Sequence, residues 1–338
     1  MPNTLSTSPN PYAAVVVLTG ASSGIGRATA LAFAREGARL VLAARGREAL
    51  EKVAAECELL DAQALVVPTD VTDADAVRAL ADAALKRFGH IDVWINNVGT
   101  GAVGTFDTTP IEAHQRVIDC NLMGHINGAH AVLPHFRQRG RGTLINMISV
   151  GGWAVAPYAA AYTASKFGLR GFSEALRAEL ASLPAVHVCE VYPTFVDTPG
   201  LAHGANYTGR RLRPSPPMLD PRRVAASLVS LSKKPRPLTA IGSVALPGRL
   251  AHAIAPNLTN RIAVKLTSLA LRHADHVPVT NGNLFEPSRG HLIDGGYRTL
   301  AVRALPVAAV ALVGTVGLGL LWAAHARRKS HRAPAARR

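Results

Sequence analysis

Cysteine is scarce in this sequence. Only Cys57, Cys120 and Cys189 occur in 338 residues, far apart and without a CxxC motif or a Cys/His cluster beside them. This scarcity excludes a disulfide framework and a cysteine-based metal centre, so we predict no metal and reduced thiols in a cytosolic compartment. The polar residues 1–11 lack the basic and apolar regions of a secretory signal, and we expect them to be flexible.

Acidic and aromatic residues are also few. The chain has 22 Asp and Glu against 37 Lys and Arg, a formal net charge of +15, and aromatic residues make up 5% of it. No basic stretch is interleaved with aromatic residues, so we expect no nucleic-acid partner. The positive charge instead favours an anionic membrane surface or an anionic substrate.

Apolar residues, in contrast, are abundant and regularly ordered, at 48% of the chain. Short apolar runs alternate with longer segments of helical spacing, which predicts βαβ units. The six expected strands are 14–18, 40–42, 64–67, 91–95, 143–148 and 186–191. The predicted fold class is α/β, a doubly wound, Rossmann-like parallel sheet that binds ligands at the carboxyl ends of its strands.

The regularity weakens after Tyr192. We predict a helix over 221–233 and a last strand over 238–246, which complete a catalytic domain over 12–247. Residues 248–300 are expected to form a helical or irregular extension. Within it, 248–273 is either an amphipathic helix at a membrane surface or a packed surface helix.

An apolar segment follows this extension. Residues 304–324 contain no ionisable group and are long enough to cross a hydrocarbon core of about 30 Å. We therefore interpret 301–326 as a membrane segment, 327–338 as a basic tail, and the catalytic domain as cytoplasmic and membrane-associated. A single span conflicts with the positive-inside rule, because the heavier basic cluster follows the segment. A hairpin, a second interfacial helix or a shallow anchor would resolve this conflict, and a buried C-terminal helix is the soluble alternative.

The first expected strand leads directly into a glycine-rich turn and a helix. Gly20 permits the tight turn, while Gly24 and Gly26 lack Cβ atoms and let a pyrophosphate approach the backbone at the helix N-terminus. The expected cofactor-binding residues of this turn are Thr19, Gly20, Ser22, Ser23, Gly24, Ile25 and Gly26.

The second expected strand ends at Arg45, where an acidic residue would indicate a free 2′-hydroxyl on the adenosine ribose. Arg45 suits a 2′-phosphate and favours NADP(H) over NAD(H), the alternative being an ordinary solvated arginine. Asp70 and Val71 follow the third strand, and Asn97 and Gly99 follow the fourth. We expect Asp70 to accept from the adenine amino group and Asn97 to brace the loop beside the adenosine.

Tyr162 and Lys166 stand four residues apart at helical spacing, hence on one face. A nearby ammonium group lowers the pKa of a phenol, which predicts that Tyr162 is a usable proton donor and acceptor. Together with Asn121 and Ser149, these motifs occur in the order typical of the short-chain dehydrogenase/reductase family, which the chain resembles over about residues 12–200.

The resemblance implies a role for each of these residues. Tyr162 would exchange a proton with the substrate oxygen, and Ser149 would polarise that oxygen. Lys166 would also hold the nicotinamide ribose, and Asn121 would anchor a water that relays protons. Hydride transfer between nicotinamide and a carbonyl or alcohol carbon is the implied reaction.

Two features depart from the family pattern. Pro193-Thr194 stands where Pro-Gly is usual, which leaves Pro193, Val196 and Thr198 to contact the nicotinamide carboxamide and phosphates. The chain also continues far beyond the usual end near residue 250, as in membrane-associated members that act on lipids, retinoids or steroids.

The expected substrate wall is mostly apolar and aromatic, so we predict a hydrophobic lipid, steroid, retinoid, aldehyde or ketone. Its candidate contacts are Trp153, Val155, Tyr158, Phe195, His203 and Tyr207. Arg210, Arg211 and Arg213 either bind an anionic head group or form a solvated loop. Two alternatives stay open: a soluble 3-oxoacyl or sugar reductase whose tail packs in a homo-oligomer interface, and a non-catalytic nucleotide-binding scaffold.

Overall fold

A parallel sheet of seven strands forms the centre of the molecule. The structure, a computed structural model, describes residues 13–213, 217–288 and 291–298. The strand order is β3-β2-β1-β4-β6-β7-β9, which is the predicted doubly wound arrangement. The strands are β1 Val15–Thr19, β2 Arg39–Ala44, β3 Ala64–Pro68, β4 Val93–Asn96, β6 Gly142–Met147, β7 Val186–Pro193 and β9 Leu238–Ile241.

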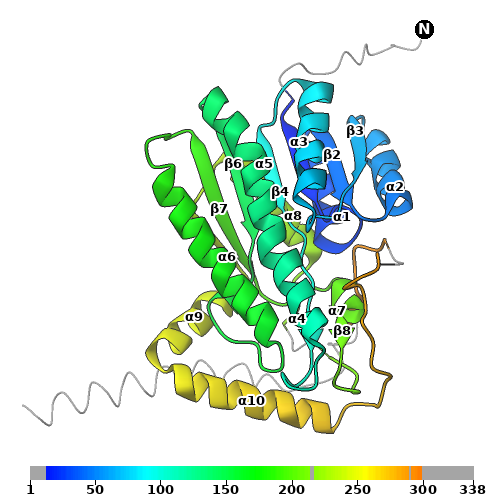
Figure 1. Cartoon of the computed structure of the whole chain (residues 1–338), viewed down its shortest axis with the longest axis vertical. Helices are drawn as coiled ribbons and strands as arrows, with labels where there is room; N and C mark the ends of the chain where they lie inside the picture. Colours follow the sequence, from blue (N-terminus) through cyan, green and yellow to red (C-terminus); the bar gives the residue numbers. More distant parts are fainter. Residues whose placement is uncertain (1–12, 214–216, 289–290, 299–338) are drawn as a thin grey trace, which may run out of the picture.

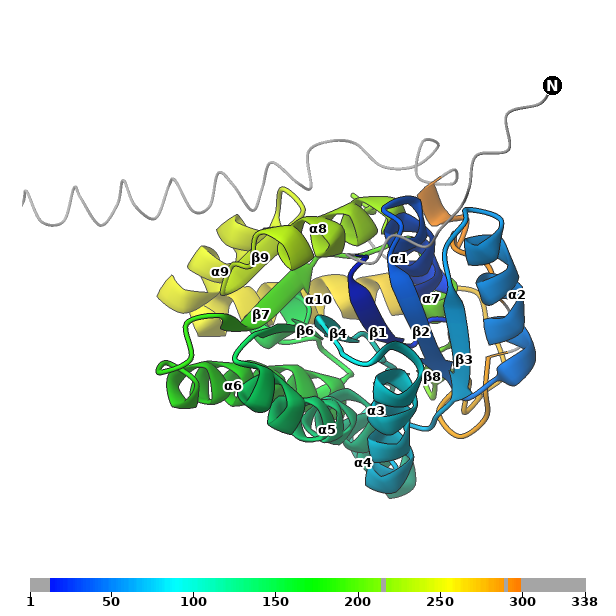
Figure 2. The same cartoon turned by 90° about the horizontal axis from the view of Figure 1, so that it is seen from above.

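Helices cover both faces of this sheet (Figure 2). One layer holds α1 Gly24–Arg35, α2 Arg47–Glu58 and α8 Pro221–Lys233; the other holds α3 Ala74–Phe88, α5 Gly124–Arg139 and α6 Ala160–Glu179. Each layer closes its own apolar cluster against the sheet. Because the central strands are covered on both sides, they read as nearly continuous apolar runs, and all five residues of β1 are buried.

Smaller elements gather at the carboxyl ends of the strands (Figure 1). A two-stranded parallel ribbon of β5 Ala102–Val103 and β8 Ala205–Asn206 lies there, with the short helices α4 Ile111–Ile118 and α7 Gly200–His203. The alternation of apolar runs did not predict this ribbon, because two-residue strands carry no periodic signal.

The predicted last strand over 238–246 is too long. Strand β9 ends at Ile241, since Gly242 has a φ of +113° and a Cβ there would overlap Thr194 Oγ1. Helix α9, Ala245–Ile254, begins soon afterwards. The expected domain boundary between 247 and 248 therefore falls inside a helix, whose Pro247 is tolerated because it stands in the first turn.

The expected amphipathic segment over 248–273 is two helices, α9 and α10 Pro256–Arg272. They separate at Ala255, because the residue before a proline avoids the helical conformation. Within 13–213, 217–288 and 291–298, no helix has the length and apolar character needed to span a membrane. The predicted membrane segment 301–326, the tail 327–338 and the N-terminal residues 1–11 lie outside the described residues.

Candidate active site

The glycine-rich turn after β1 forms a close-packed backbone cradle. Gly20 and Gly24 have φ values of +67° and +53°, in the left-handed region that favours glycine. A Cβ at Gly26 would overlap the carbonyl oxygen of Gly20. The start of α1 is therefore pressed against the turn, and only glycine fits at this contact.

Asn97, at the end of β4, is fastened to this turn. Its side-chain amide donates to the carbonyl oxygens of Thr19 and Gly20, each at 3.2 Å. Its backbone N–H donates to Thr19 Oγ1 at 3.1 Å, and this hydroxyl in turn donates to the carbonyl of Ile95. The bracing expected of Asn97 is thus present in the geometry.

A π-helical turn over Asp119–Met123 carries Asn121 between α4 and α5. Asn121 is fully buried and pairs with the backbone of Thr100 in both directions, at 2.8 Å and 2.9 Å. Its amide also donates to Ser165 Oγ at 3.2 Å. Asn121 therefore ties the loop after β4 to helix α6, which carries Tyr162 and Lys166.

Tyr162, Lys166 and Ser149 meet at one point beside this loop. Lys166 Nζ lies 5.9 Å from the centre of the Tyr162 ring and donates to the carbonyl of Met147 at 3.0 Å. A Cβ at Gly151 would come within 3.0 Å of the Tyr162 ring and 3.6 Å of Ser149 Oγ. The structure thus brings together the side chains that the sequence proposed as catalytic.

Ser149 has an unusual backbone. Its φ is 145° and its ψ is 161°, a conformation that residues with a Cβ seldom adopt. The side-chain oxygen accepts from the backbone N–H of Gly151 at 3.1 Å. This contact fixes the hydroxyl at the end of β6, where it faces Tyr162.

The electrostatics differ from the expectation in one respect. Burial raises the pKa of Tyr162, and the hydrogen bond with Ser149 lowers it only in part. Lys166 does not offset this, because burial lowers the pKa of its own ammonium group to about 7. The expected lowering of the Tyr162 pKa by Lys166 is therefore absent from the protein without cofactor.

The chain is similar in sequence to known oxidoreductases. The family model described as short chain dehydrogenase matches residues 14–206. The chain belongs to the short-chain dehydrogenase/reductase family. Uncharacterized oxidoreductase YxnA of Bacillus subtilis (strain 168) is 31% identical to it over 330 residues, which are 93% of this chain and 90% of that protein. Dehydrogenase/reductase SDR family member 7 of Mus musculus is 37% identical over 183 residues, 53% of this chain and 54% of that protein.

Two solved oxidoreductase structures superpose on the chain. An alcohol dehydrogenase from Thermococcus sibiricus, complexed with 5-hydroxy-NADP, has a TM-score of 0.61 and 29% identity over 69% of this chain and 97% of its own. A variant of actinorhodin polyketide ketoreductase with NADPH has a TM-score of 0.63 and 28% identity over 69% and 97%. The protein is an NAD(P)-dependent short-chain dehydrogenase/reductase that acts on CH–OH or C=O groups.

The near-neutral Lys166 gives this short-chain dehydrogenase/reductase a testable pH response. A bound anionic cofactor favours the ammonium form and should raise the Lys166 pKa above about 7. Between the two pKa values the complex holds more protons than the free protein, so NADPH binding at pH 8 is expected to take up protons. Titration calorimetry in phosphate and Tris buffers measures this uptake. Lys166→Met should abolish it, and a buffer-independent heat for the unsubstituted protein would contradict the expectation.

The adenosine side of the site is not open as the sequence implied. Arg45, the expected partner of a 2′-phosphate, has its guanidinium bonded to four backbone carbonyls between residues 283 and 286. Burial opposes ionisation of Asp70, but hydrogen bonds from Arg116 and Thr72 outweigh it and lower the Asp70 pKa. Asp70 Oδ2 accepts a hydrogen bond from the Arg116 guanidinium at 2.6 Å. Arg116 was not predicted, because no motif marks it.

The remaining predicted cofactor residues lie at the same end of the sheet or close to it. Val71 is buried and its carbonyl accepts from Asn127 at 2.9 Å. A Cβ at Gly99 would lie 3.7 Å from Lys166 Nζ, so the loop passes close to the ammonium group. Ser23 precedes α1 and its side chain makes no capping hydrogen bond. Ser22 and Ile25 lie in the same turn and are half-buried.

The loop after β7 is anchored at both ends. Pro193 is buried and pairs with Ile241 of β9, and Val196 forms a bridge with Leu219. Val196 belongs to the apolar core, so its side chain is not free to contact a cofactor. Thr198 faces the phosphate turn, since a Cβ at Gly24 would lie 3.2 Å from it.

The expected substrate wall holds only in part. Trp153 is buried and stacks on Tyr192 with ring centroids 3.9 Å apart, so it is a core residue and not a surface for substrate. Phe195 is exposed, and Val155, Tyr158, His203 and Tyr207 are half-buried.

The loop arginines are already engaged. Arg211 and Arg213 reach Asp275 at 3.4 Å and 3.2 Å, and Arg210 donates to the carbonyl of Ala274 at 3.1 Å. They pair with the chain after α10, and Arg211, Arg213 and Asp275 remain exposed, as the solvated-loop alternative expects.

A buried polar network beneath the site was missed by sequence reasoning. The Asn96 amide donates to Asn146 Oδ1 and to the carbonyl of His125, each at 3.0 Å. Its oxygen accepts from Trp94 Nε1 at 2.8 Å, and Asn146 continues the chain to Ser173 at 2.9 Å. Polar residues inside apolar strands were the available signal. The network is buried and supports the loops from beneath.

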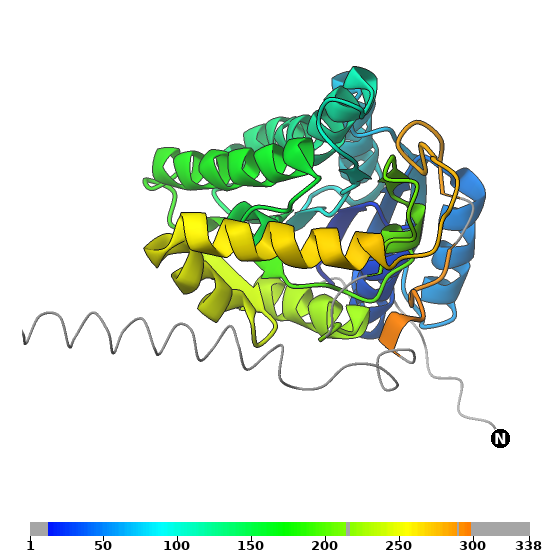
Figure 3. The same ribbon diagram turned by 90° about the horizontal axis from the view of Figure 1, so that it is seen from below.

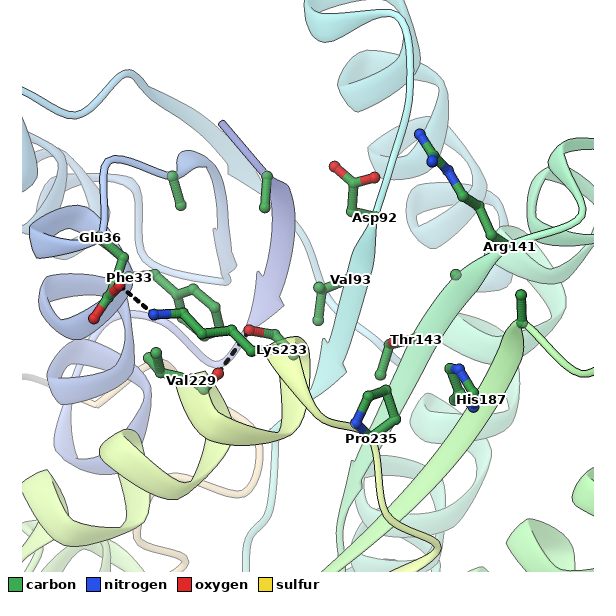
Figure 4. A pocket seen from close by; sticks show the side chains of 15 residues that line it. Phe33, Glu36, Asp92, Val93, Arg141, Thr143, His187, Val229, Lys233 and Pro235 are labelled. Atoms are coloured by element: carbon green, nitrogen blue, oxygen red, sulfur yellow. Dashed lines mark hydrogen bonds and ion pairs between the residues drawn. The ribbon is translucent and has the colours of Figure 1, made fainter. Parts of the chain in front are cut away.

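A hollow of about 460 Å³ lies at the other end of the sheet (Figure 4). Its lining comes from the amino ends of the strands, including Asp92 and Thr143, and from α8, where Lys233 pairs with Glu36, the residue directly after α1. None of the predicted site residues lines it. Its position excludes it as the site of the chemistry described above.

Proposed function

We propose that the protein is an NADP(H)-dependent carbonyl reductase or alcohol dehydrogenase in which Tyr162 is the acid/base. The convergence of Tyr162, Ser149 and Lys166 carries this proposal, with the glycine cradle positioned to receive the cofactor phosphates. A bound nicotinamide supplies or accepts the hydride. We propose as catalytic and cofactor-binding residues the same residues that the sequence indicates for these two roles.

In this scheme Ser149 and Tyr162 carry out the proton transfer to or from the substrate oxygen. Ser149 holds the substrate oxygen, and the Tyr162 phenol gives it a proton during reduction or takes one during oxidation. Burial raises the Tyr162 pKa above that of an ordinary phenol, so Tyr162 is protonated at neutral pH and can donate to a carbonyl oxygen.

The substrate is proposed to be hydrophobic. Phe195 is 50% exposed beside the site, and the ring of Tyr162 lies in an apolar cluster with Ala102 and Val117. An uncharged lipid, steroid, retinoid, aldehyde or ketone matches these surroundings better than a sugar. NADPH oxidation against a panel of these classes, with a sugar ketone as the control, tests the proposal. Turnover of the sugar alone would contradict it.

Arg45 carries the proposed cofactor preference. The 2′-phosphate of NADP(H) offers the planar guanidinium a bidentate anion that NAD(H) lacks. Arg45→Ala is expected to reduce the ratio of NADPH to NADH in kcat/KM by about tenfold or more, the scale of a charged hydrogen bond. Parallel kinetics with both cofactors measure the ratio. An unchanged ratio would show that residues other than Arg45 determine the preference for NADPH over NADH.

Association with a membrane surface is a second proposal, carried by α9 and α10. Helix α10 has no buried residue among those described, and both helices present stripes of exposed apolar side chains at helical spacing. The stripes are Leu246, Leu250 and Ile254 on α9, and Leu258, Ile262, Leu266 and Leu269 on α10. Figure 3 shows α10, in yellow, running across the end of the molecule that holds the candidate site.

The charge of this surface selects the partner. Residues 242–274 contain Arg249, Arg261, Lys265 and Arg272 but no Asp or Glu. Two copies of such a surface repel each other, whereas an anionic bilayer accepts both the apolar stripes and the cations. The proposed partner is therefore a membrane surface rich in anionic lipid.

Vesicle flotation tests this surface in the full chain. The double substitution Ile262→Ser and Leu266→Ser should weaken binding to phosphatidylglycerol-containing vesicles by at least about tenfold, given the apolar area removed. Leu59→Ser, at a position 84% exposed directly after α2, is the matched control. Equal binding of both variants would contradict docking through α10.

A further inference from the structure

The chain after α10 returns to the candidate site as an extended strap. We define the strap as residues 281–288 and 291–298, drawn in orange in Figure 1. It runs beside β8 and α7 and on toward α1 and α2 (Figures 1 and 2). Its contacts follow the groups proposed to hold the cofactor, from the adenosine end to the loop after β7.

The adenosine end of the strap occupies Arg45. The guanidinium donates to the carbonyls of Asn283 at 2.7 Å and Glu286 at 2.9 Å, and also to those of Leu284 and Phe285 at 3.2 Å and 3.0 Å. Four oxygens converge on one fork, as the oxygens of a phosphate group would. While these bonds exist, Arg45 cannot also grip a 2′-phosphate.

The middle of the strap occupies the start of α1. The backbone N–H of Gly24 donates to the carbonyl of Leu292 at 2.9 Å. Arg27, one turn further along the helix, donates to the carbonyl of His291. Gly24 belongs to the N-terminal amides that would otherwise face a pyrophosphate oxygen.

Two anchors hold the strap in this position. Leu284 is fully buried in a cluster with Ala102, Ala113 and Val117, and its carbonyl also accepts from Arg116 at 3.0 Å. Asn283 accepts from Thr100 Oγ1 at 3.0 Å, in the same loop that Asn121 secures.

At the other end, the buried Asp197 accepts from the backbone N–H groups of Tyr297 and Arg298 at 2.9 Å and 3.1 Å. Arg298 then bridges Asp197 to Asp220 and Asp294. The loop after β7, proposed to contact the nicotinamide half, is therefore also engaged by the strap.

We propose that the strap competes with NADP(H) for Arg45 and Gly24, so that the protein covers its own proposed cofactor-binding groups and the cofactor must displace the strap to bind. This rests on the proposed function, since it assumes that these groups hold a nucleotide. Carbonyl oxygens imitate the anion, and Leu284 supplies the apolar anchor. Cofactor affinity is then reduced by the fraction of molecules whose strap is closed.

Hydrogen exchange of the full chain tests the displacement directly. Saturating NADPH should speed amide exchange in peptides from the strap, because bound cofactor removes the Gly24 and Arg45 contacts. Slower exchange of the strap with NADPH would overturn the proposal, since it would show that the strap closes over the cofactor.

A pair of substitutions tests the competition by affinity. Leu284→Ala removes the buried anchor and should tighten NADPH binding by about tenfold or more, because truncating a buried leucine strongly destabilises the closed state. Leu292→Ala is the matched control, because that side chain is 61% exposed and its contact to Gly24 is made by the backbone. Fluorescence titration measures both dissociation constants.

The outcomes separate this proposal from the proposed function. Weaker or unchanged NADPH binding by Leu284→Ala, with the melting temperature of the core transition preserved, contradicts the competition alone. If neither NADPH nor NADH binds to the unsubstituted protein or to Leu284→Ala, the proposed function fails. Tighter binding with faster strap exchange supports both.

Discussion

Tyr162→Phe is expected to lower kcat for carbonyl reduction by about 10² to 10⁴-fold, the usual contribution of a positioned acid/base. The substitution removes the phenol oxygen that pairs with Ser149 and keeps the ring that packs against Ala102 and Val117. The fold and the NADPH dissociation constant should therefore be preserved. Single-turnover oxidation of NADPH at saturating substrate measures the loss.

The pH profile gives this prediction a second readout. Burial raises the Tyr162 pKa, so the phenol loses its proton only in the alkaline range, and reduction should decline there. Tyr162→Phe should abolish this alkaline limb, the decline of the rate at high pH, and should also lower the rate itself. A variant that keeps both the rate and the limb would show that another group delivers the proton.

Gly26→Ala is expected to weaken NADPH binding by at least about 10²-fold, because it displaces the phosphate turn by a distance comparable to a bond length. A Cβ at this position would overlap the carbonyl oxygen of Gly20 and would also approach the Asn97 amide to 2.9 Å. The turn and its Asn97 brace must both shift. Overpacking should lower the free energy of unfolding by about 1–3 kcal/mol.

Gly171→Ala is the matched control for this change. Gly171 lies in α6, and a Cβ there meets nothing within 4 Å. Alanine should raise the free energy of unfolding by about 0.5–1 kcal/mol, since it is the better helix former. Thermal melting and NADPH titration of both variants complete the comparison. Normal cofactor binding by Gly26→Ala would show that the turn tolerates a side chain.

The sequence predicts the sheet well because its strands are buried on both faces. Each of the six expected apolar runs overlaps an observed strand, from β1 to β7, and the helix over 221–233 coincides with α8. Prediction fails where structure depends on contacts distant in sequence. The stop of β9 is set by Thr194 packing against Gly242, and no local pattern announces it.

The candidate site follows the same rule. Tyr162 and Lys166 share one helix, so their spacing places them together. The occupation of Arg45 could not be foreseen, because its partners stand about 240 positions later and offer backbone carbonyls, which carry no residue-type signal. The raised Tyr162 pKa was also beyond reach, since it depends on burial and not on spacing.

The π turn at Asp119–Met123 has a consequence for any helical-wheel description of residues 111–139. A π turn holds one residue more than an α turn, so it rotates the next helix by about 100° relative to a regular continuation. Helix α5 therefore does not continue the face of α4, and a single wheel drawn from α4 places every α5 position about 100° from its true direction. Removing one residue here would restore a regular helix and rotate Asn121 away from the loop that it fastens.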